Sequence, residues 1–125
     1  LMGSLFQNCG VQGAIIDGAC RDTDELKDLG FVVFSRAVTA RGTHTMFSGR
    51  KDDMAVNVPV QCGGIVVSPG DMIIADEIGV TVVPKADLAS VIVAAREQAE
   101  REEATRQRIK QGRTFEQLLE EFGRI

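Results

Sequence analysis

The side chains best suited to chemistry lie in one short stretch near the start of the chain, Asp17-Gly18-Ala19-Cys20-Arg21-Asp22. Arg21 can hold a carboxylate through two parallel hydrogen bonds and keeps its charge at any working pH. Asp22 offers oxygen ligands, which hard divalent cations prefer. A cation and an arginine together suit reactions in which a carbon–carbon bond next to a carbonyl breaks and an enolate must be stabilised. The stretch therefore indicates a site for a small 2-oxo acid.

The same stretch also admits a purely structural interpretation. Asp22 precedes a predicted helix, and Glu25 three residues later completes a pattern that resembles a capping box. Arg21 would then be the ion-pair partner of Asp22 or a surface arginine, and Asp17-Gly18 is a common turn dipeptide. The motif chemistry by itself leaves both interpretations open.

Other catalytic side chains are scarce. The chain has one histidine, His44, three cysteines, and neither tryptophan nor tyrosine. Cys9, Cys20 and Cys62 form no C-x-x-C pair, which excludes a zinc ribbon and a dithiol redox site. We expect the thiols to be small buried side chains in a reducing compartment, and His44 to be an exposed loop residue. A metal would need oxygen ligands, which favours Mg²⁺ or Mn²⁺.

Composition narrows the class of protein further. A chain of 125 residues with 44% hydrophobic and 26% charged residues has the values of one ordinary globular domain. The net charge of −4 argues against a protein that binds nucleic acid or a membrane surface. No apolar run approaches the ~20 residues of a membrane span. We therefore expect a cytoplasmic protein whose ligand is a small molecule.

The glycines divide the chain into a turn-rich part, residues 1–84, and a helical tail, residues 85–125. Eleven of the 13 glycines lie before residue 80. Short apolar runs between turn residues predict buried strands, and Gly18 is expected to turn the chain after the first of them. The elements expected first are a helix ending at residue 9, a strand at 13–17, a helix at 24–29, a strand at 31–34 and a long loop at 37–54.

Four further strands are predicted in quick succession, and short turns between them indicate antiparallel pairing. A long helix follows, with Leu88, Val91, Ile92 and Ala95 as its core-facing stripe. Thr114 and Gln117 form a capping box that starts a last short helix. The expected strands are 55–60, 64–67, 72–75 and 81–83, and the expected helices are 85–111 and 114–122.

These residues resemble a known family. Residues 13–22 are similar to the G-x-V-x-D-G-x-x-R-D signature of the RraA-like / 4-hydroxy-4-methyl-2-oxoglutarate aldolase family. Residues 57–64 resemble its N-x-P-V-x-x-G-G segment, and residues 69–84 resemble its P-G-D…A-D-x-x-G-V-x-V-V-P run. Several separated motifs in the right order make the resemblance specific, and it extends over about residues 1–112.

The resemblance implies an α/β fold of the swivelling β/β/α kind, an α-β-β-α sandwich with a long C-terminal helix, assembled as homotrimers or hexamers. It implies a metal-dependent (class II) aldolase that uses Mg²⁺ or Mn²⁺. Such an enzyme cleaves 4-hydroxy-4-methyl-2-oxoglutarate or 4-carboxy-4-hydroxy-2-oxoadipate to pyruvate and a second oxo acid, through a metal-stabilised pyruvate enolate. Oxaloacetate decarboxylation is the expected side activity.

The resemblance also assigns roles to residues. Arg21 matches the substrate-binding arginine and Asp22 the metal-binding aspartate. Leu1 and Met2 align with the end of a turn whose backbone N–H groups bind the pyruvate carboxylate at a helix N-terminus. The acidic residue of that turn would stand immediately before Leu1, so we expect the chain to be the C-terminal portion of a longer protein. Glu102 or Glu103 matches a tail glutamate that reaches a neighbouring subunit's site.

Three arginines, Arg36, Arg41 and Arg50, are candidates for binding the distal carboxylate of the substrate, or are solvated surface residues. The alternative function within the family is a regulator that binds and inhibits a ribonuclease without catalysis. The intact Arg21-Asp22 pair and the tail at residues 85–125 favour the enzyme. A methyltransferase is disfavoured, because no glycine-rich nucleotide fingerprint follows a strand.

Overall fold

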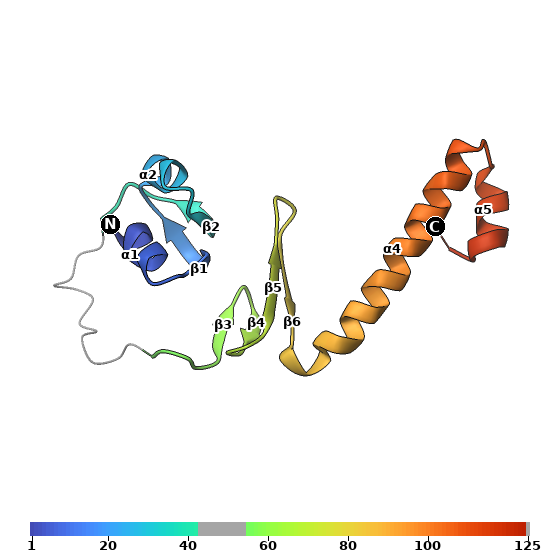
Figure 1. Cartoon of the computed structure of the whole chain (residues 1–125). Coiled ribbons are helices and arrows are strands. Elements are labelled where there is room, and N and C mark those ends of the chain that lie inside the picture. The colour runs from blue at the N-terminus through green and yellow to red at the C-terminus, as the bar shows by residue number, and fades with distance from the viewer. Residues whose placement is uncertain (43–54, 125) are drawn as a thin grey trace. The chain divides into compact units, whose positions relative to one another are not determined.

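A computed structural model describes residues 1–42 and 55–124 of the chain (Figure 1). By its internal packing the chain divides into two compact units. Unit 1 comprises Leu1–Pro69 and Ala75–Val80, and unit 2 comprises Gly70–Ile74 and Thr81–Ile125. The secondary structure is mixed α/β with a long C-terminal helix, which confirms the predicted fold class.

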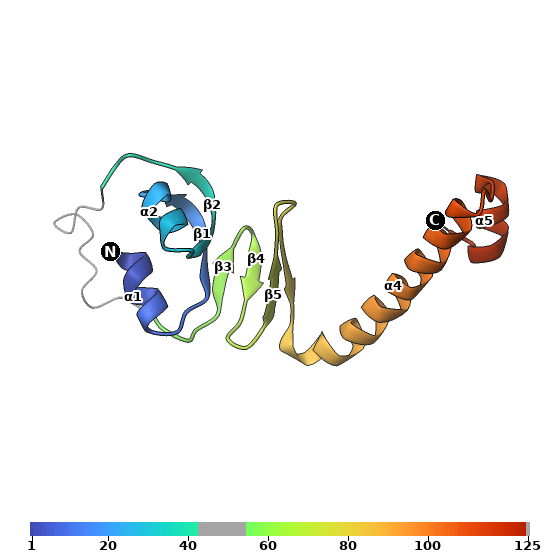
Figure 2. The same cartoon turned by 45° about the horizontal axis from the view of Figure 1, so that its top comes forward.

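Unit 1 opens with two helices and two strands that alternate along the chain. Strands β1 and β2 pair in parallel, and α2 forms the crossover between them (Figures 1 and 2). A helix commonly makes this connection, because parallel strands cannot be joined by a tight turn. The elements are α1 (Met2–Asn8), β1 (Gly13–Cys20), α2 (Thr23–Asp28) and β2 (Val32–Val38).

The core of this βαβ region is small. Among the described residues, Phe31 is its one buried large side chain, at 6% exposure, and its ring lies 6.2 Å from that of Phe6 on α1. Gly3 allows α1 to approach α2 closely, because a Cβ at this position would lie 2.8 Å from Cδ2 of Leu26. Packing of α1 against α2 and against Phe31, just before β2, therefore fixes the start of the chain beside the first strands.

Strand β1 is longer than the sequence predicts. We expected it to end at Asp17 with a turn at Gly18, but it continues to Cys20. The reason is one extra residue, since Asp17 and Gly18 together lie opposite a single residue of β2, Arg36. This arrangement is a β-bulge, which keeps a Gly-containing pair within a strand instead of ending it.

The next two strands, β3 (Val60–Cys62) and β4 (Ile65–Val67), form the expected antiparallel hairpin. Its turn is Gly63-Gly64, with φ angles of 62° and 82° that a two-residue hairpin turn of this kind requires. The predicted strand at 55–60 is wrong except at Val60. Asn57 has a φ of 57°, in the left-handed region that a regular strand does not contain.

The rest of the chain contains a strand pair and a helical hairpin. Strands β5 and β6 pair with each other, and α5 folds back along the second half of α4 (Figures 1 and 2). The capping box at the start of α5 is confirmed, since the Thr114 hydroxyl accepts from the Gln117 N–H and the Gln117 side chain accepts from the Thr114 N–H. The elements are β5 (Met72–Ala75), β6 (Val80–Val83), η1 (Lys85–Asp87), α4 (Leu88–Lys110) and α5 (Phe115–Phe122).

The predicted core-facing stripe of α4 is wrong at three of its four residues in the described part of the chain, since Leu88 alone is half-buried. Val91 and Ile92 are 39% and 44% exposed, and Ala95 is exposed as well. Helix α5 covers a later part of α4 instead, as the ion pair between Arg108 and Glu121 shows. None of the described helices combines the length and apolar character needed to cross a membrane.

Candidate active site

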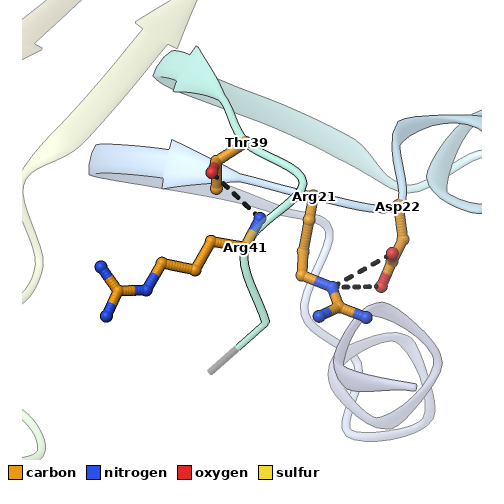
Figure 3. A network of polar contacts seen from close by, with 4 residues as sticks. All are labelled: Arg21, Asp22, Thr39 and Arg41. Carbon is orange, nitrogen blue, oxygen red and sulfur yellow. Dashed lines mark hydrogen bonds and ion pairs between the residues drawn. The ribbon is translucent and has the colours of Figure 1, made fainter. Parts of the chain in front are cut away.

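Arg21 and Asp22 directly follow β1, at its C-terminal end, and precede α2. Nε of Arg21 donates to both carboxylate oxygens of Asp22, at 3.1 and 3.0 Å (Figure 3). Their side chains are 48% and 46% exposed, so a ligand can reach both. Ligands commonly bind where strands of an α/β sheet end, because side chains and free backbone groups converge there. The ion-pair interpretation of these residues is confirmed.

The capping-box interpretation of Asp22 is wrong. Asp22 occupies the N-cap position of α2, but its side chain accepts no capping hydrogen bond from the helix. Its φ and ψ of 56° and 45° lie in the left-handed region, which costs a non-glycine residue on the order of 1–3 kcal/mol. Such strain is concentrated at functional sites. The unusual backbone turns the carboxylate away from the helix and towards Arg21.

A segment after β2 lies against Arg21. The Thr39 N–H donates to the Cys20 carbonyl at 2.9 Å, and the Arg41 N–H donates to Oγ1 of Thr39 at 3.1 Å (Figure 3). A Cβ at Gly42 would lie 2.7 Å from Nη1 of Arg21, so a larger residue there would require the guanidinium to shift. This contact was not predicted, since a single glycine in a loop is an ordinary feature of a sequence.

Asp17 forms hydrogen bonds to β2 and to the turn between β3 and β4. Its carboxylate accepts hydrogen bonds from Nε of Arg36 on β2 and from the Gly63 N–H, the latter at 2.8 Å. The Arg36 guanidinium, and then the Gly63 N–H, keep the pKa of the Asp17 carboxyl below its usual range. Asp17 correspondingly raises the pKa of Arg36. Arg36, a candidate for binding the distal carboxylate of the substrate, pairs with Asp17, and its role towards the substrate stays a prediction.

The other predicted site residues lie on other elements. Leu1 is the fully exposed N-cap residue of α1, and Met2 begins that helix. Glu102 and Glu103 lie on α4 in unit 2, where Glu102 accepts from Gln98 and Glu103 pairs with Arg106. The structure therefore brings together Arg21 and Asp22, with Gly42 beside them. The roles expected for the four other residues stay predictions.

The expected burial of the cysteines is wrong at one position. Cys9, expected to be buried, is exposed, because it caps the C-terminal end of the short helix α1. Cys20 and Cys62 are half-buried, and Sγ of Cys20 accepts from the Ser35 hydroxyl at 3.1 Å. Arg41 extends its guanidinium away from Arg21 (Figure 3). His44, Arg50 and most of the predicted loop at 37–54 lie outside the described residues.

The donor set at the site agrees with a hard cation. Within residues 1–42 and 55–124, no group of three or more histidine, cysteine or acidic side chains is arranged to hold a metal. Mg²⁺, however, commonly takes only one or two carboxylates and completes its shell with water and substrate oxygens. The exposed carboxylate of Asp22 meets that requirement as a single protein ligand.

A parallel βαβ region with an arginine–aspartate pair at its strand end defines an α/β protein with a candidate site at that strand end. A family model described as RraA-like (Aldolase/RraA) matches residues 1–82. The chain belongs to the RraA-like family. A relative from Halalkalibacterium halodurans, named "Putative 4-hydroxy-4-methyl-2-oxoglutarate aldolase", is 36% identical over 100 residues, which are 80% of this chain and 45% of the relative. The chain spans about half the length of the curated relatives it matches.

Two solved structures share the fold. An uncharacterized protein from Pseudomonas syringae pv. tomato is similar with a TM-score of 0.76 and 31% identity, over 94% of this chain and 56% of that one. Streptomyces coelicolor RraAS2, described as an unusual member of the RNase ES inhibitor RraA protein family, is similar with a TM-score of 0.71 and 28% identity. That match covers 84% of this chain and 52% of RraAS2.

Proposed function

We propose that the protein is a divalent-metal-dependent aldolase that cleaves 4-hydroxy-4-methyl-2-oxoglutarate or 4-carboxy-4-hydroxy-2-oxoadipate to pyruvate and a second oxo acid. The observation that carries the proposal is the Arg21–Asp22 pair, held in a strained turn at the end of β1 and open to solvent. The aldolase name of a relative that is 36% identical supports it. Oxaloacetate decarboxylation follows as a side activity, because it also releases pyruvate from a 2-oxo acid.

Arg21 is suited to bind and stabilise the substrate. Asp22 engages its Nε, and the terminal Nη groups are the donors that can bind oxygens of a 2-oxo acid. As the carbon–carbon bond breaks, the fixed positive charge of Arg21 offsets the negative charge that develops on the substrate oxygen. Asp22 orients the guanidinium, and Gly42 leaves room for it.

Asp22 would hold the cation, Mg²⁺ or Mn²⁺. When bound, the cation supplies positive charge that polarises the substrate carbonyl. We further propose that the protein assembles as a homotrimer or hexamer, in which Glu102 or Glu103 reaches the site of a neighbouring subunit. Their position on the exposed surface of a long helix supports this proposal.

The test is pyruvate release by the natural full-length protein from oxaloacetate and from 4-hydroxy-4-methyl-2-oxoglutarate. We expect turnover with Mg²⁺ or Mn²⁺, loss of turnover after chelation, and recovery when the metal is added back. Turnover that is indifferent to a chelator would contradict the metal dependence. No pyruvate from either substrate, or from 4-carboxy-4-hydroxy-2-oxoadipate, would contradict the aldolase.

A second candidate is a regulator that binds and inhibits a ribonuclease. It is supported by the similarity to Streptomyces coelicolor RraAS2, at 28% identity. The two candidates make different predictions in one pair of assays. A regulator lowers the rate of RNA cleavage by the ribonuclease and releases no pyruvate, whereas the proposed aldolase releases pyruvate.

A further inference from the structure

The strand that leads to the candidate site carries an irregularity just before it. At Asp17 and Gly18, two residues of β1 lie opposite Arg36 of β2. Side chains along a strand alternate between its two faces, so one extra residue exchanges the faces for every residue beyond it. Arg21 and Asp22 follow this bulge after two further strand residues, Ala19 and Cys20. The bulge therefore determines the direction in which the two side chains leave the strand.

The bulge is held from two sides by one carboxylate. Arg36, 19 residues away, donates to Oδ1 of Asp17 from the neighbouring strand. Gly63, 46 residues away, donates its backbone N–H to Oδ2 at 2.8 Å from the β3–β4 turn. Bulges in parallel pairs are rare, and they locally disrupt the ladder of backbone hydrogen bonds. The Asp17 side chain supplies contacts at the point where that ladder is interrupted.

The two donors suit an ionised carboxylate. Hydrogen bonds from an arginine or a backbone N–H to a charged oxygen are stronger than those between neutral groups. Both donors lower the pKa of Asp17, because they stabilise its ionised form. Gly63 and Gly64 adopt φ angles of 62° and 82°, so the donating turn has a defined geometry. Asp17 thus joins three parts of the fold, which are β1, β2 and the turn of the β3–β4 hairpin.

We propose that Asp17 is a positioning residue for the Arg21–Asp22 site. Its carboxylate locks the bulge of β1 to β2 and to the β3–β4 turn, and in this way sets the orientation of Arg21 and Asp22. The proposal deepens the proposed function and rests on it for the chemistry of the site. The competing outcome is that Asp17 forms an exposed ion pair without consequence, as many surface pairs do.

The test compares Asp17→Ala and Asp17→Asn with a matched control, Asp28→Asn, at an exposed aspartate of α2. In Asp17→Ala we expect the backbone amide NMR signals of Gly63, Arg21 and Asp22 to move. We also expect kcat for pyruvate formation to fall about 10- to 100-fold, as for other supports of active-site residues. Asp17→Asn keeps oxygen acceptance for Gly63 and recovers most of that kcat. The control, Asp28→Asn, is expected to change neither these amide signals nor kcat.

The two readouts separate this proposal from the proposed function. If the wild-type protein forms no pyruvate, the aldolase fails and the amide signals alone decide the role of Asp17. Unmoved Arg21 and Asp22 signals in Asp17→Ala would overturn the positioning role, and so would an unchanged kcat in an active enzyme. If Asp17→Ala does not fold, Arg36→Met removes one of the two donors, and it must move the same signals to sustain the proposal.

Discussion

Polar contacts of Asp17 and polar contacts within helix α4 join residues at very different separations along the chain. Around the site, Asp17 binds Arg36 and Gly63, which are 19 and 46 residues away. On α4, Glu103 pairs with a residue three positions away, and Gln98 donates to a residue four positions away. Contacts of the second kind stabilise one helix and follow from its periodicity. Contacts of the first kind join separate elements.

The backbones of the two regions differ in the same way. In the α4–α5 hairpin, helix α5 begins and ends with ordinary caps, Thr114 and Gly123. The site contains a bulge at Asp17-Gly18, and Asp22 is in the left-handed region. Because irregular backbone costs free energy, its presence beside the arginine–aspartate pair supports the functional role proposed for these residues. The α4–α5 hairpin, by contrast, has the regular backbone expected of an element that contributes mainly to stability.

The largest expected effect separates the regions by activity. Replacing Arg21 with alanine removes the fixed charge that stabilises the developing anion, and we expect kcat/KM for pyruvate formation to fall about 10²- to 10³-fold. Arg96→Ala, at an exposed position of α4, is the matched control and leaves kcat/KM within about twofold. Steady-state kinetics with oxaloacetate measures both. Equal losses in the two variants would remove the distinction between the regions.

The next effect separates them by stability. Leu118 is 4% exposed, and its truncation to alanine leaves a cavity where α5 packs. We expect the hairpin to lose about 2–5 kcal/mol of stability. Hydrogen exchange should accelerate in the amides of α5, while the amide signals of Arg21 and Asp22 stay in place. Acceleration confined to the βαβ region would show that Leu118 supports a different part of the molecule.

A smaller effect is expected at Gly42. In Gly42→Ala the new Cβ would lie 2.7 Å from Nη1 of Arg21, so the guanidinium must shift. Because displacement of a positioning group lowers turnover strongly, we expect kcat/KM to fall about tenfold with little change in Tm. Gly79→Ala is the control, since a Cβ there meets no atom within 4 Å. An undisturbed kcat/KM in Gly42→Ala would place the functional surface of Arg21 elsewhere.

The smallest effect is a dependence on pH. The pKa of Asp17 is lowered in the folded protein by Arg36 and Gly63. The contacts of its carboxylate are therefore complete above the ordinary value of about 3.9 and are lost as the pH falls through the lower, folded value. The Gly63 amide signal should follow this titration, and the Asp17→Asn variant should abolish it. A midpoint above the ordinary value would contradict the lowered pKa.

The sequence predicted the cap of α5 and the turn of the β3–β4 hairpin more accurately than the geometry of the candidate site, and the reason is physical. Thr114 and Gln117 form a capping box whose partners are three residues apart, so a local pattern determines the contact. The Gly63-Gly64 turn was equally local. The end of β1 was mispredicted because Asp-Gly fits both a turn and a bulge, and the choice depends on Arg36 and Gly63.

Within the site, the Arg21–Asp22 pair was visible because two neighbouring residues of opposite charge can meet without any help from the fold. The contact of Gly42 with Arg21 was missed, since it requires β2 to run parallel to β1 and return its following segment to the end of that strand. The apolar stripe of α4 was predicted from the helical period of its apolar residues. A period does not show whether another element packs against that face. Val91 and Ile92 consequently remain exposed in the described chain.

The most direct measurement is the rate of pyruvate release from oxaloacetate with Mg²⁺, compared between Asp22→Asn and Asp28→Asn in the natural full-length protein. Both variants remove one carboxylate charge, and only Asp22 adjoins Arg21 at the end of β1. We predict that kcat/KM falls by at least about 10²-fold in Asp22→Asn and changes less than about twofold in Asp28→Asn. Wild-type kcat/KM in Asp22→Asn would contradict the assignment of the site.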